Sequence, residues 1–267
     1  MVFGTGDFFG GLATRRAPML SVLVVSQGVG LVGMLAAALI AGGTPTGADL
    51  LLGGAGGLVG GAGIALLYRA LATGTMALVA PVTGVVAAIV PVAVGIGAGE
   101  RPALLQLLGI ALAVVAVALL SGGRPRSGAR LRGTSLLMAL GSGVGFGLFY
   151  IALARTSAGA GLWPLVAARV ASVTAFGGAL AVRREGPSRG TGGLSLMIAT
   201  GVFDVTANAL YVFAVHRGLL SIVAVLVSLY PASTVLWSLV FLGERLRALQ
   251  VAGVALALGA VALITAG

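Results

Sequence analysis

Long apolar stretches follow one another along almost the whole chain, separated by short segments rich in glycine, proline and arginine. Most of these stretches have about 20 residues, the length of an α-helix that crosses the hydrocarbon core of a bilayer. Membrane β-strands would alternate in polarity, whereas the segment LLGIALAVVAVALL is apolar at every position. The pattern predicts an all-α integral membrane protein with ten transmembrane helices, near residues 1–14, 18–42, 50–72, 75–98, 103–121, 133–155, 161–182, 193–215, 219–242 and 246–266.

The first apolar stretch is shorter than the others. Only fourteen residues precede Arg15, fewer than the roughly 20 that a spanning helix needs. A signal peptide would carry its positive charge before the apolar segment, but here Arg15 and Arg16 follow it. We therefore expect a shortened first helix, which a start codon assigned too late or a truncation would explain.

The composition leaves little room for a domain outside the membrane, since 59% of the residues are hydrophobic and only 8% are charged. The formal charge of +10 comes from arginines that lie mostly between the apolar stretches, where they face anionic lipid, so we expect the bilayer and no nucleic acid as a partner. The chain has no cysteine and a single histidine, His216. We therefore expect no metal site, no cofactor and no enzymatic activity.

One phrase occurs twice, as GERPALLQ from Gly99 and as GERLRALQ from Gly243. A shift of 144 residues aligns these segments without a gap, together with the helices that follow them and with pairs such as Gly57 and Gly201. This self-similarity predicts two five-helix repeats, 1–123 and 133–267, joined by a basic linker loop at 124–132. Because five crossings leave the chain on the opposite side of the membrane, the second repeat is predicted to be inverted.

The residues that carry this repeat also resemble a known family. The segment GLLSIVAVLVSLYPASTVLWSLVFLGERLRALQVAGVALALGAVALI resembles the closing segment of EamA-type members of the drug/metabolite transporter superfamily, and GERPALLQLLGIALAVVAVALL is similar to its first-half counterpart. The resemblance implies ten helices in two halves, a central cavity and carrier activity toward small organic solutes. The shortened first helix departs from the family's pattern.

The arginines are distributed unevenly between the two predicted sides of the membrane. Twelve fall on one side and three, Arg101, Arg155 and Arg217, on the other. Under the positive-inside rule the richer side is cytoplasmic, which places both termini outside, whereas the family resemblance implies cytoplasmic termini. The sequence predicts that both termini share one side and leaves open which side it is.

Charged residues inside apolar stretches are functional candidates, because they are costly to place in lipid. Thr200, Asp204, Asn208 and Tyr211 recur at helical spacing and form one polar stripe in the eighth stretch. This stripe is either a cavity wall that binds solute or a set of interhelical hydrogen bonds. We predict Asp204, Asn208 and Tyr211 as substrate-binding residues.

Arg169 in the seventh stretch aligns with Gln27 in the second, judged from LVAARV and LVVSQG. Its guanidinium either pairs with Asp204 or binds a solute carboxylate, and the pairing is the simpler interpretation. If Arg169 and Asp204 both face the cavity, they suit a zwitterion such as an amino acid. We include Gln27 and Arg169 among the predicted substrate-binding residues.

Asp7 lies in the first stretch, the region where small multidrug-resistance proteins of the same superfamily carry an essential acidic residue. A carboxylate there can exchange a proton for a cationic solute, or else it lies near the water interface. Aromatic residues are a further predicted group: Tyr150, Tyr230 and Trp237 line the cavity or lie at the membrane interfaces, and we predict Tyr150 and Tyr230 as substrate-binding.

Three other residue types have structural interpretations. Pro81, Pro91, Pro164 and Pro231 are predicted to interrupt or begin helices. The glycine rows of the third and sixth stretches predict close helix packing, within one molecule or in a homodimer. The Glu-Arg loops, with Glu100 and Glu244, are interpreted as anchors or helix caps in preference to gates.

These features together predict a multi-pass carrier of the plasma membrane, here a bacterial inner membrane, that exports an amino acid or amine-like metabolite by alternating access. Protons are a candidate coupling ion. A proton-coupled multidrug or cation efflux carrier, a cation channel and a structural membrane subunit are the alternatives. A membrane enzyme would need a clustered nucleophile, base or metal set, which the sequence lacks.

Overall fold

The computed structural model describes residues 2–14, 16–73, 76–120, 133–183, 193–230, 233, 237 and 248–266. Within these ranges the regular structure is helical, and no strand occurs. The elements are α1 (Val2–Thr14), α2 (Met19–Ala41), α3 (Gly47–Thr73), α4 (Met76–Gly97), α5 (Leu104–Leu120), α6 (Gly133–Ala154), the short 3-10 helix η1 (Ala158–Ala160), α7 (Trp163–Arg183), α8 (Leu194–Val215), α9 (Leu220–Ser228) and α11 (Ala248–Ala266).

The helices agree with the apolar stretches in number and position along most of the described chain. In the described part of the chain, five helices are long and apolar enough to cross a membrane by length and composition: Met19–Ala41, Gly47–Ala70, Gly133–Ala154, Trp163–Val182 and Leu194–Val215. Val82–Gly97, Leu104–Ala116 and Val251–Ile264 are shorter apolar segments. The protein is therefore a multi-pass membrane protein. The predicted linker, 124–132, and Glu244 lie outside the described residues.

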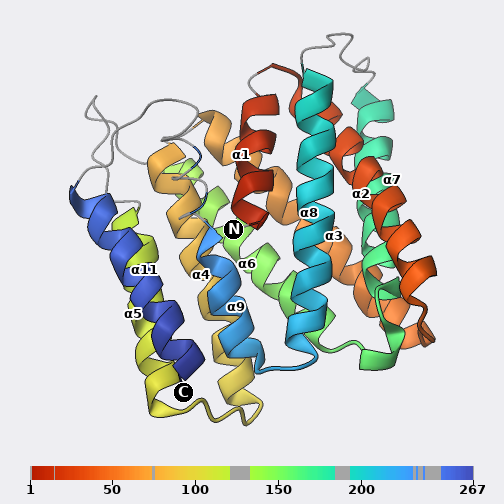
Figure 1. Ribbon diagram of the computed structural model, residues 1–267. Coiled ribbons are helices and arrows are strands. Elements are labelled where there is room, and N and C mark those ends of the chain that lie inside the picture. Colours follow the sequence, from red (N-terminus) through yellow and green to blue (C-terminus); the bar gives the residue numbers. More distant parts are fainter. Residues whose placement is uncertain are drawn as a thin grey trace.

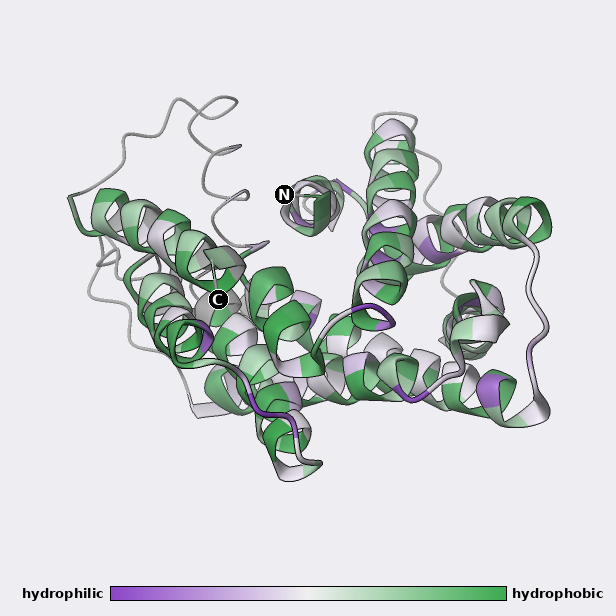
Figure 2. Cartoon of the chain, turned by 60° about the horizontal axis from the view of Figure 1, so that its bottom comes forward, coloured by the Kyte–Doolittle hydropathy of each residue, from purple (hydrophilic) through white to green (hydrophobic). Residues whose placement is uncertain are grey.

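The helices form a bundle in which α5 and α11 make an outer pair beside α4 and α9, while α1, α2, α3, α6, α7 and α8 form the larger part (Figure 1). Hydrophobic residues predominate along the helices, and hydrophilic residues are concentrated in short stretches (Figure 2). Among the described residues, thirty large hydrophobic side chains are exposed, including Ile40 and Leu51. Such a surface is expected where lipid replaces water as the solvent.

Glycine lets several pairs of helices approach closely. A Cβ atom at Gly57 of α3 would collide with the backbone of Ala168 in α7, and one at Gly201 of α8 would lie 2.5 Å from the carbonyl oxygen of Ser26 in α2. A Cβ at Gly145 of α6 would lie 3.0 Å from the Cα of Gly63 in α3. The predicted glycine rows of the third and sixth stretches thus pack inside the bundle.

The prolines behave differently from one another. Pro164 is the second residue of α7, where its missing N–H costs no hydrogen bond, as predicted. The prediction that Pro81 and Pro91 interrupt a helix is wrong, because α4 runs through both without a break. The Pro91 ring packs against α6, where a Cβ at Gly147 would lie 3.3 Å from its Cδ atom. Pro231 lies outside the described residues.

Polar contacts join the loops at one end of the bundle. Glu100 follows α4 after a turn in which Gly99 has φ 99°, and its carboxylate accepts hydrogen bonds from the backbone N–H groups of Leu220 (2.7 Å) and Ser221 (3.0 Å). These are the first residues of α9. The helix-cap interpretation of Glu100 is therefore confirmed: a carboxylate faces the positive end of a helix from the other half of the chain.

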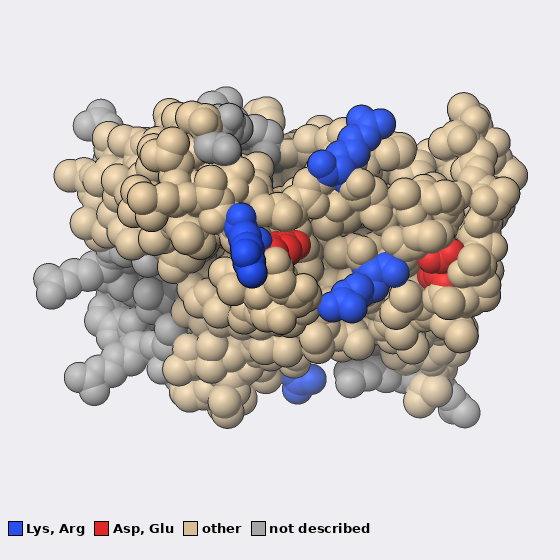
Figure 3. Space-filling view, turned by 90° about the horizontal axis from the view of Figure 1, so that it is seen from below, with Lys and Arg blue, Asp and Glu red and all other residues tan. Residues whose placement is uncertain are grey.

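The same end holds a second link between the halves. The buried carboxylate of Asp49 in α3 accepts hydrogen bonds from Thr46 and from the backbone N–H (2.7 Å) and hydroxyl (2.9 Å) of Ser157 in the loop between α6 and α7. Arg101, Arg155 and Arg217 are exposed in loops of this end. The view from below shows charged side chains spread over this face (Figure 3).

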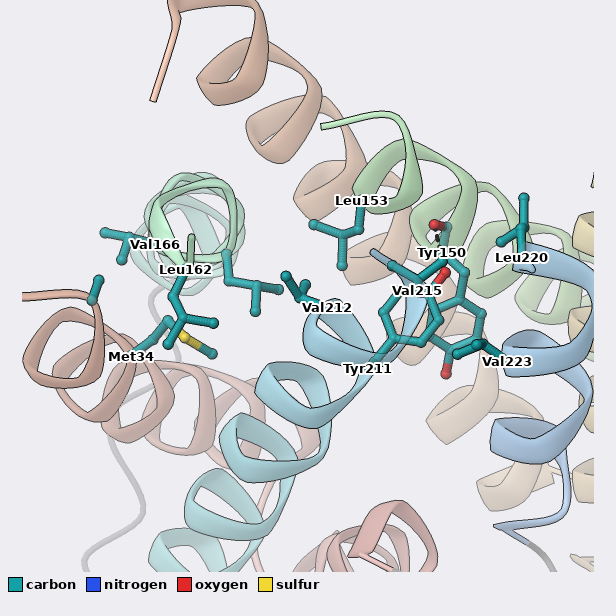
Figure 4. Close-up of a cluster of buried hydrophobic side chains, with 12 residues drawn as sticks. Met34, Tyr150, Leu153, Leu162, Val166, Tyr211, Val212, Val215, Leu220 and Val223 are labelled. Atoms are coloured by element: carbon teal, nitrogen blue, oxygen red, sulfur yellow. Dashed lines mark hydrogen bonds between the residues drawn. The ribbon is translucent and has the colours of Figure 1, made fainter. Parts of the chain in front are cut away.

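A hydrophobic cluster fills the bundle just inside these loops. It comprises Met34, Ala38, Tyr150, Leu153, Leu162, Leu165, Val166, Tyr211, Val212, Val215, Leu220 and Val223. These residues come from α2, α6, α7, α8 and α9, close to the helix ends that the loops connect (Figure 4). Side chains from both halves of the chain therefore occupy this end of the molecule.

Candidate functional site

A cavity of about 650 Å³, part of it open to solvent, lies among six helices. α1, α2, α3, α6, α7 and α8 contribute to its wall, and Tyr230 follows α9. The lining residues are Phe3, Asp7, Gln27, Gly57, Gly60, Gly61, Ile64, Phe146, Phe149, Tyr150, Ala168, Arg169, Ser172, Asp204, Asn208 and Tyr230. Seven of the eight residues predicted from the sequence to bind substrate therefore line one cavity, and Tyr211 is the exception.

Arg169 is the centre of the polar cluster in this wall. Its guanidinium donates to the carboxylate of Asp204 with one terminal nitrogen and to the amide oxygen of Gln27 with the other. The Arg169 side chain is 7% exposed and that of Asp204 is 24% exposed. The predicted pairing of Arg169 with Asp204 is confirmed, and both ends of the guanidinium fork are occupied.

Two further residues hold this arrangement in place. Ser172, one helical turn after Arg169, donates its hydroxyl to the same oxygen of Gln27 at 2.9 Å. A Cβ atom at Gly30 in α2 would lie 3.5 Å from Nε of Arg169. Position 30 of α2 therefore lies next to the arginine side chain, where α2 and α7 meet.

Asn208 lies one helical turn after Asp204 on α8. Its amide nitrogen donates to the backbone carbonyl of Asp204 at 2.8 Å and to the Asp204 carboxylate at 3.1 Å. These two acceptors fix the orientation of the amide, because the reverse orientation would place oxygen against oxygen. The amide oxygen of Asn208 is buried and has no hydrogen-bond partner among the described residues.

Asp7 reaches the cavity because α1 packs closely on α8. A Cβ atom at Gly6 would lie 3.4 Å from the Cβ of Phe203 and 3.5 Å from the backbone nitrogen of Asp204. The Asp7 side chain is partly buried in the cavity wall. No described residue forms an ion pair with its carboxylate.

The predicted tyrosines divide between two positions. Tyr150 and Tyr230 line the cavity. Tyr211 lies behind Tyr150: its hydroxyl donates to the backbone carbonyl of Tyr150 at 2.7 Å, and the two ring centroids are 4.7 Å apart (Figure 4). Trp237 is also absent from the lining, and its indole N–H donates to the hydroxyl of Thr5 at 2.6 Å.

The two sides of the cavity differ in chemistry. Charged and amide side chains come from α1, α2, α7 and α8, whereas α3 and α6 contribute glycine, Ile64 and three aromatic residues. Apart from Tyr150, the residues of this apolar side were not predicted from the sequence, although the 144-residue shift aligns Gly60 with Asp204 and Ile64 with Asn208. No group of three or more histidine, aspartate or glutamate side chains suited to a metal ion occurs in the described part of the chain.

Comparison with known proteins gives a family match and a structural match. The family model described as EamA-like transporter family matches residues 133–266. A solved crystal structure aligns with a TM-score of 0.77 over 99% of this chain and 95% of that chain, at 18% sequence identity. This likeness shows that the two chains share a fold. No protein of the curated set matches the chain.

Proposed function

Because the chain belongs to the EamA-like transporter family, we propose that it is a secondary carrier that moves an amino acid or amine-like metabolite across the plasma membrane by alternating access. The observation that carries this proposal is the cavity itself. A buried guanidinium, two carboxylates and two amides line one space inside a bundle of apolar helices. Ionisable groups in such a place typically mark a solute pathway.

We further propose that the two halves are inverted five-helix repeats with boundaries at 1–123 and 133–267. Helix contacts support this. Gly57 of the first half contacts Ala168 of the second. A shift of 144 residues takes Gly57 to Gly201, and a shift of 142 residues takes Ser26 to Ala168. Gly201 and Ser26, the equivalent pair, are also in contact. The family match at 133–266 coincides with the second proposed repeat. Inverted repeats around a central site provide two equivalent ways to open it.

One end of the bundle is in a closed arrangement, which also supports alternating access. The hydrophobic cluster, the Glu100 cap and the Asp49–Ser157 link all join the halves there. In the proposed cycle these contacts break when the cavity opens to this end. Export is the proposed direction, and the bilayer is the expected environment.

The test is solute counterflow by purified protein in liposomes, with a panel of amino acids, amines and drug-like cations, with and without a pH gradient. A carrier gives saturable exchange that unlabelled substrate on the far side accelerates, whereas a channel does not. We expect Asp204→Asn to abolish exchange. Thr206→Ala is the matched control, because Thr206 is exposed on the same helix and its hydroxyl bonds only within α8.

Wild-type protein that inserts normally and shows no counterflow with any member of the panel would contradict the carrier proposal. Full activity of Asp204→Asn would instead remove the Asp204 side chain from the mechanism while leaving the carrier in place. Direction is measured separately, by comparing uptake in right-side-out and inside-out vesicles.

A further inference from the structure

The charges that line the cavity do not balance. Among the described residues, the acidic and basic side chains of its wall are Asp7, Arg169 and Asp204. Arg169 and Asp204 form an ion pair and neutralise each other. The segment that follows Tyr230, residues 231–243, contains no lysine, arginine or histidine. The ionised form of Asp7 therefore leaves the cavity with one net negative charge, which is costly in an apolar bundle unless a cation is nearby.

The Arg169 guanidinium is already paired in this arrangement. Its two terminal nitrogens donate to Gln27 and Asp204, and Gln27 is held in turn by Ser172. A solute carboxylate would have to share this guanidinium with Asp204 and would add a further negative charge to the cavity. The zwitterion interpretation, which needs Arg169 to be available, is therefore disfavoured by the geometry.

Asn208 adds an unfilled acceptor to the same cavity. It is 2% exposed, its amide nitrogen is fully used by Asp204, and its amide oxygen has no partner in the described part of the structure. A buried carbonyl oxygen without a donor is unfavourable. A ligand N–H group would satisfy it, whereas a ligand without N–H or O–H groups would leave it unpaired.

The opposite side of the cavity defines the rest of the ligand. Phe146 and Phe149 of α6 and Ile64 of α3 line it, together with Gly57, Gly60 and Gly61 of α3. Such a wall favours a flat apolar group, and aromatic rings also attract a nearby cation through their faces. The two sides together fit a molecule with a charged head and a flat body.

From these observations, and resting on the proposed carrier function, we infer that the cavity selects a protonated amine that has N–H groups, an apolar or aromatic body and no carboxylate. The ammonium group pairs with Asp7 and donates to the amide oxygen of Asn208. Arg169 is a positioning residue that holds Asp204 and, through it, the Asn208 amide.

Three compounds with one skeleton test each part of this inference. 2-Phenylethylamine carries the ammonium, L-phenylalanine adds a carboxylate, and N,N,N-trimethyl-2-phenylethylammonium keeps the charge without N–H groups. We expect counterflow of 2-phenylethylamine at least about tenfold more efficient than that of either analogue, since each analogue leaves one buried group unsatisfied. The ratios are measured within one preparation of wild-type protein, so they do not depend on how much of it is active.

Variants then assign the selectivity to residues. Asp7→Asn should reduce 2-phenylethylamine counterflow by about tenfold or more, and Asp7→Glu should retain the preference for the amine. Asn208→Ala should reduce the discrimination against the trimethyl compound, whereas Thr206→Ala should not. Thermal unfolding in detergent shows whether each variant is folded.

The possible failures are distinct. Efficient counterflow of L-phenylalanine without that of the amine would overturn the inference and leave the carrier proposal standing. Equal transport of the amine and its trimethyl analogue would overturn the role of the Asn208 oxygen. Transport of neither the amine nor any other member of the wider panel would contradict the inference and the carrier function together.

Discussion

At the scale of single residues, the ion pair of Arg169 and Asp204 joins α7 to α8. Its effect on stability and its proposed part in transport can be tested separately. Removing one partner leaves a buried charge uncompensated, which costs about 3–5 kcal/mol when both groups are fully buried. Asp204, at 24% exposed, places this pair toward the lower end. Replacing both partners by neutral residues removes the uncompensated charge. Stability and transport should therefore respond differently to the single and double substitutions.

We predict that Asp204→Asn lowers the free energy of unfolding by about 2–3 kcal/mol, and that Arg169→Gln combined with Asp204→Asn recovers most of this loss without recovering transport. Thermal unfolding in detergent measures the first effect and counterflow the second. A double variant as unstable as the single one would show that the pair's stabilisation does not depend on its charge. Arg217→Gln, at an exposed loop position, is the control for loss of one arginine.

The sequence predicted which residues face the cavity better than it predicted how far along each helix the cavity extends. Asp7, Gln27, Arg169, Asp204 and Asn208 were identified because polar groups in apolar helices must face protein or water. Tyr211 shares one face of α8 with Asp204 and Asn208, but it lies seven residues beyond Asp204, or about 10 Å along the helix axis. Helical periodicity gives the face and not the depth at which the neighbouring helices enclose a cavity.

At the scale of elements, glycine positions determine which helices touch. We predict that Gly57→Ala and Gly201→Ala each destabilise the protein by about 1–3 kcal/mol, because the new methyl group meets the backbone of a neighbouring helix. Gly54→Ala is the matched control on α3: a Cβ there meets nothing within 4 Å. Since alanine is the better helix former, that variant should be neutral or slightly stabilised. Thermal unfolding of the three variants tests this, and an equally unstable Gly54→Ala would contradict it.

The Glu100 cap belongs to the same scale, since it joins the loop after α4 to the start of α9. Glu100→Gln keeps the shape of the side chain but removes its negative charge. It also places an NH2 group where one carboxylate oxygen accepts a backbone hydrogen bond. We predict a loss of about 1 kcal/mol in the free energy of unfolding, measured by thermal unfolding at low and high salt. Arg101→Gln, next to it and exposed, should change stability little. An unchanged melting temperature for Glu100→Gln would mean that water replaces the carboxylate at no cost.

At the scale of the whole molecule, hydropathy alone predicted most helix boundaries to within about three residues. Lipid explains this, because every backbone group in it must be satisfied within a helix. Hydropathy did not predict which loops join the two halves at one end of the bundle. This junction depends on contacts such as Asp49 with Ser157, which are 108 residues apart. No local pattern marks the partner of a single carboxylate in a distant loop.

The proposed inverted arrangement of the halves makes a prediction that can be tested with single cysteines. Because the chain has no cysteine, any introduced thiol is the only one present. Arg16 lies in the loop after the first helix and Arg155 in the loop after the sixth, its counterpart five helices later, and both are exposed. Because an odd number of crossings separates them, we predict that a membrane-impermeant maleimide labels Arg16→Cys and Arg155→Cys from opposite faces. The membrane face from which Arg16→Cys is labelled also gives the absolute orientation of the protein. The arginine counts and the family resemblance assign this orientation differently. Labelling of both positions from one face would rule out the inverted repeat and, with it, the two equivalent openings on which alternating access depends.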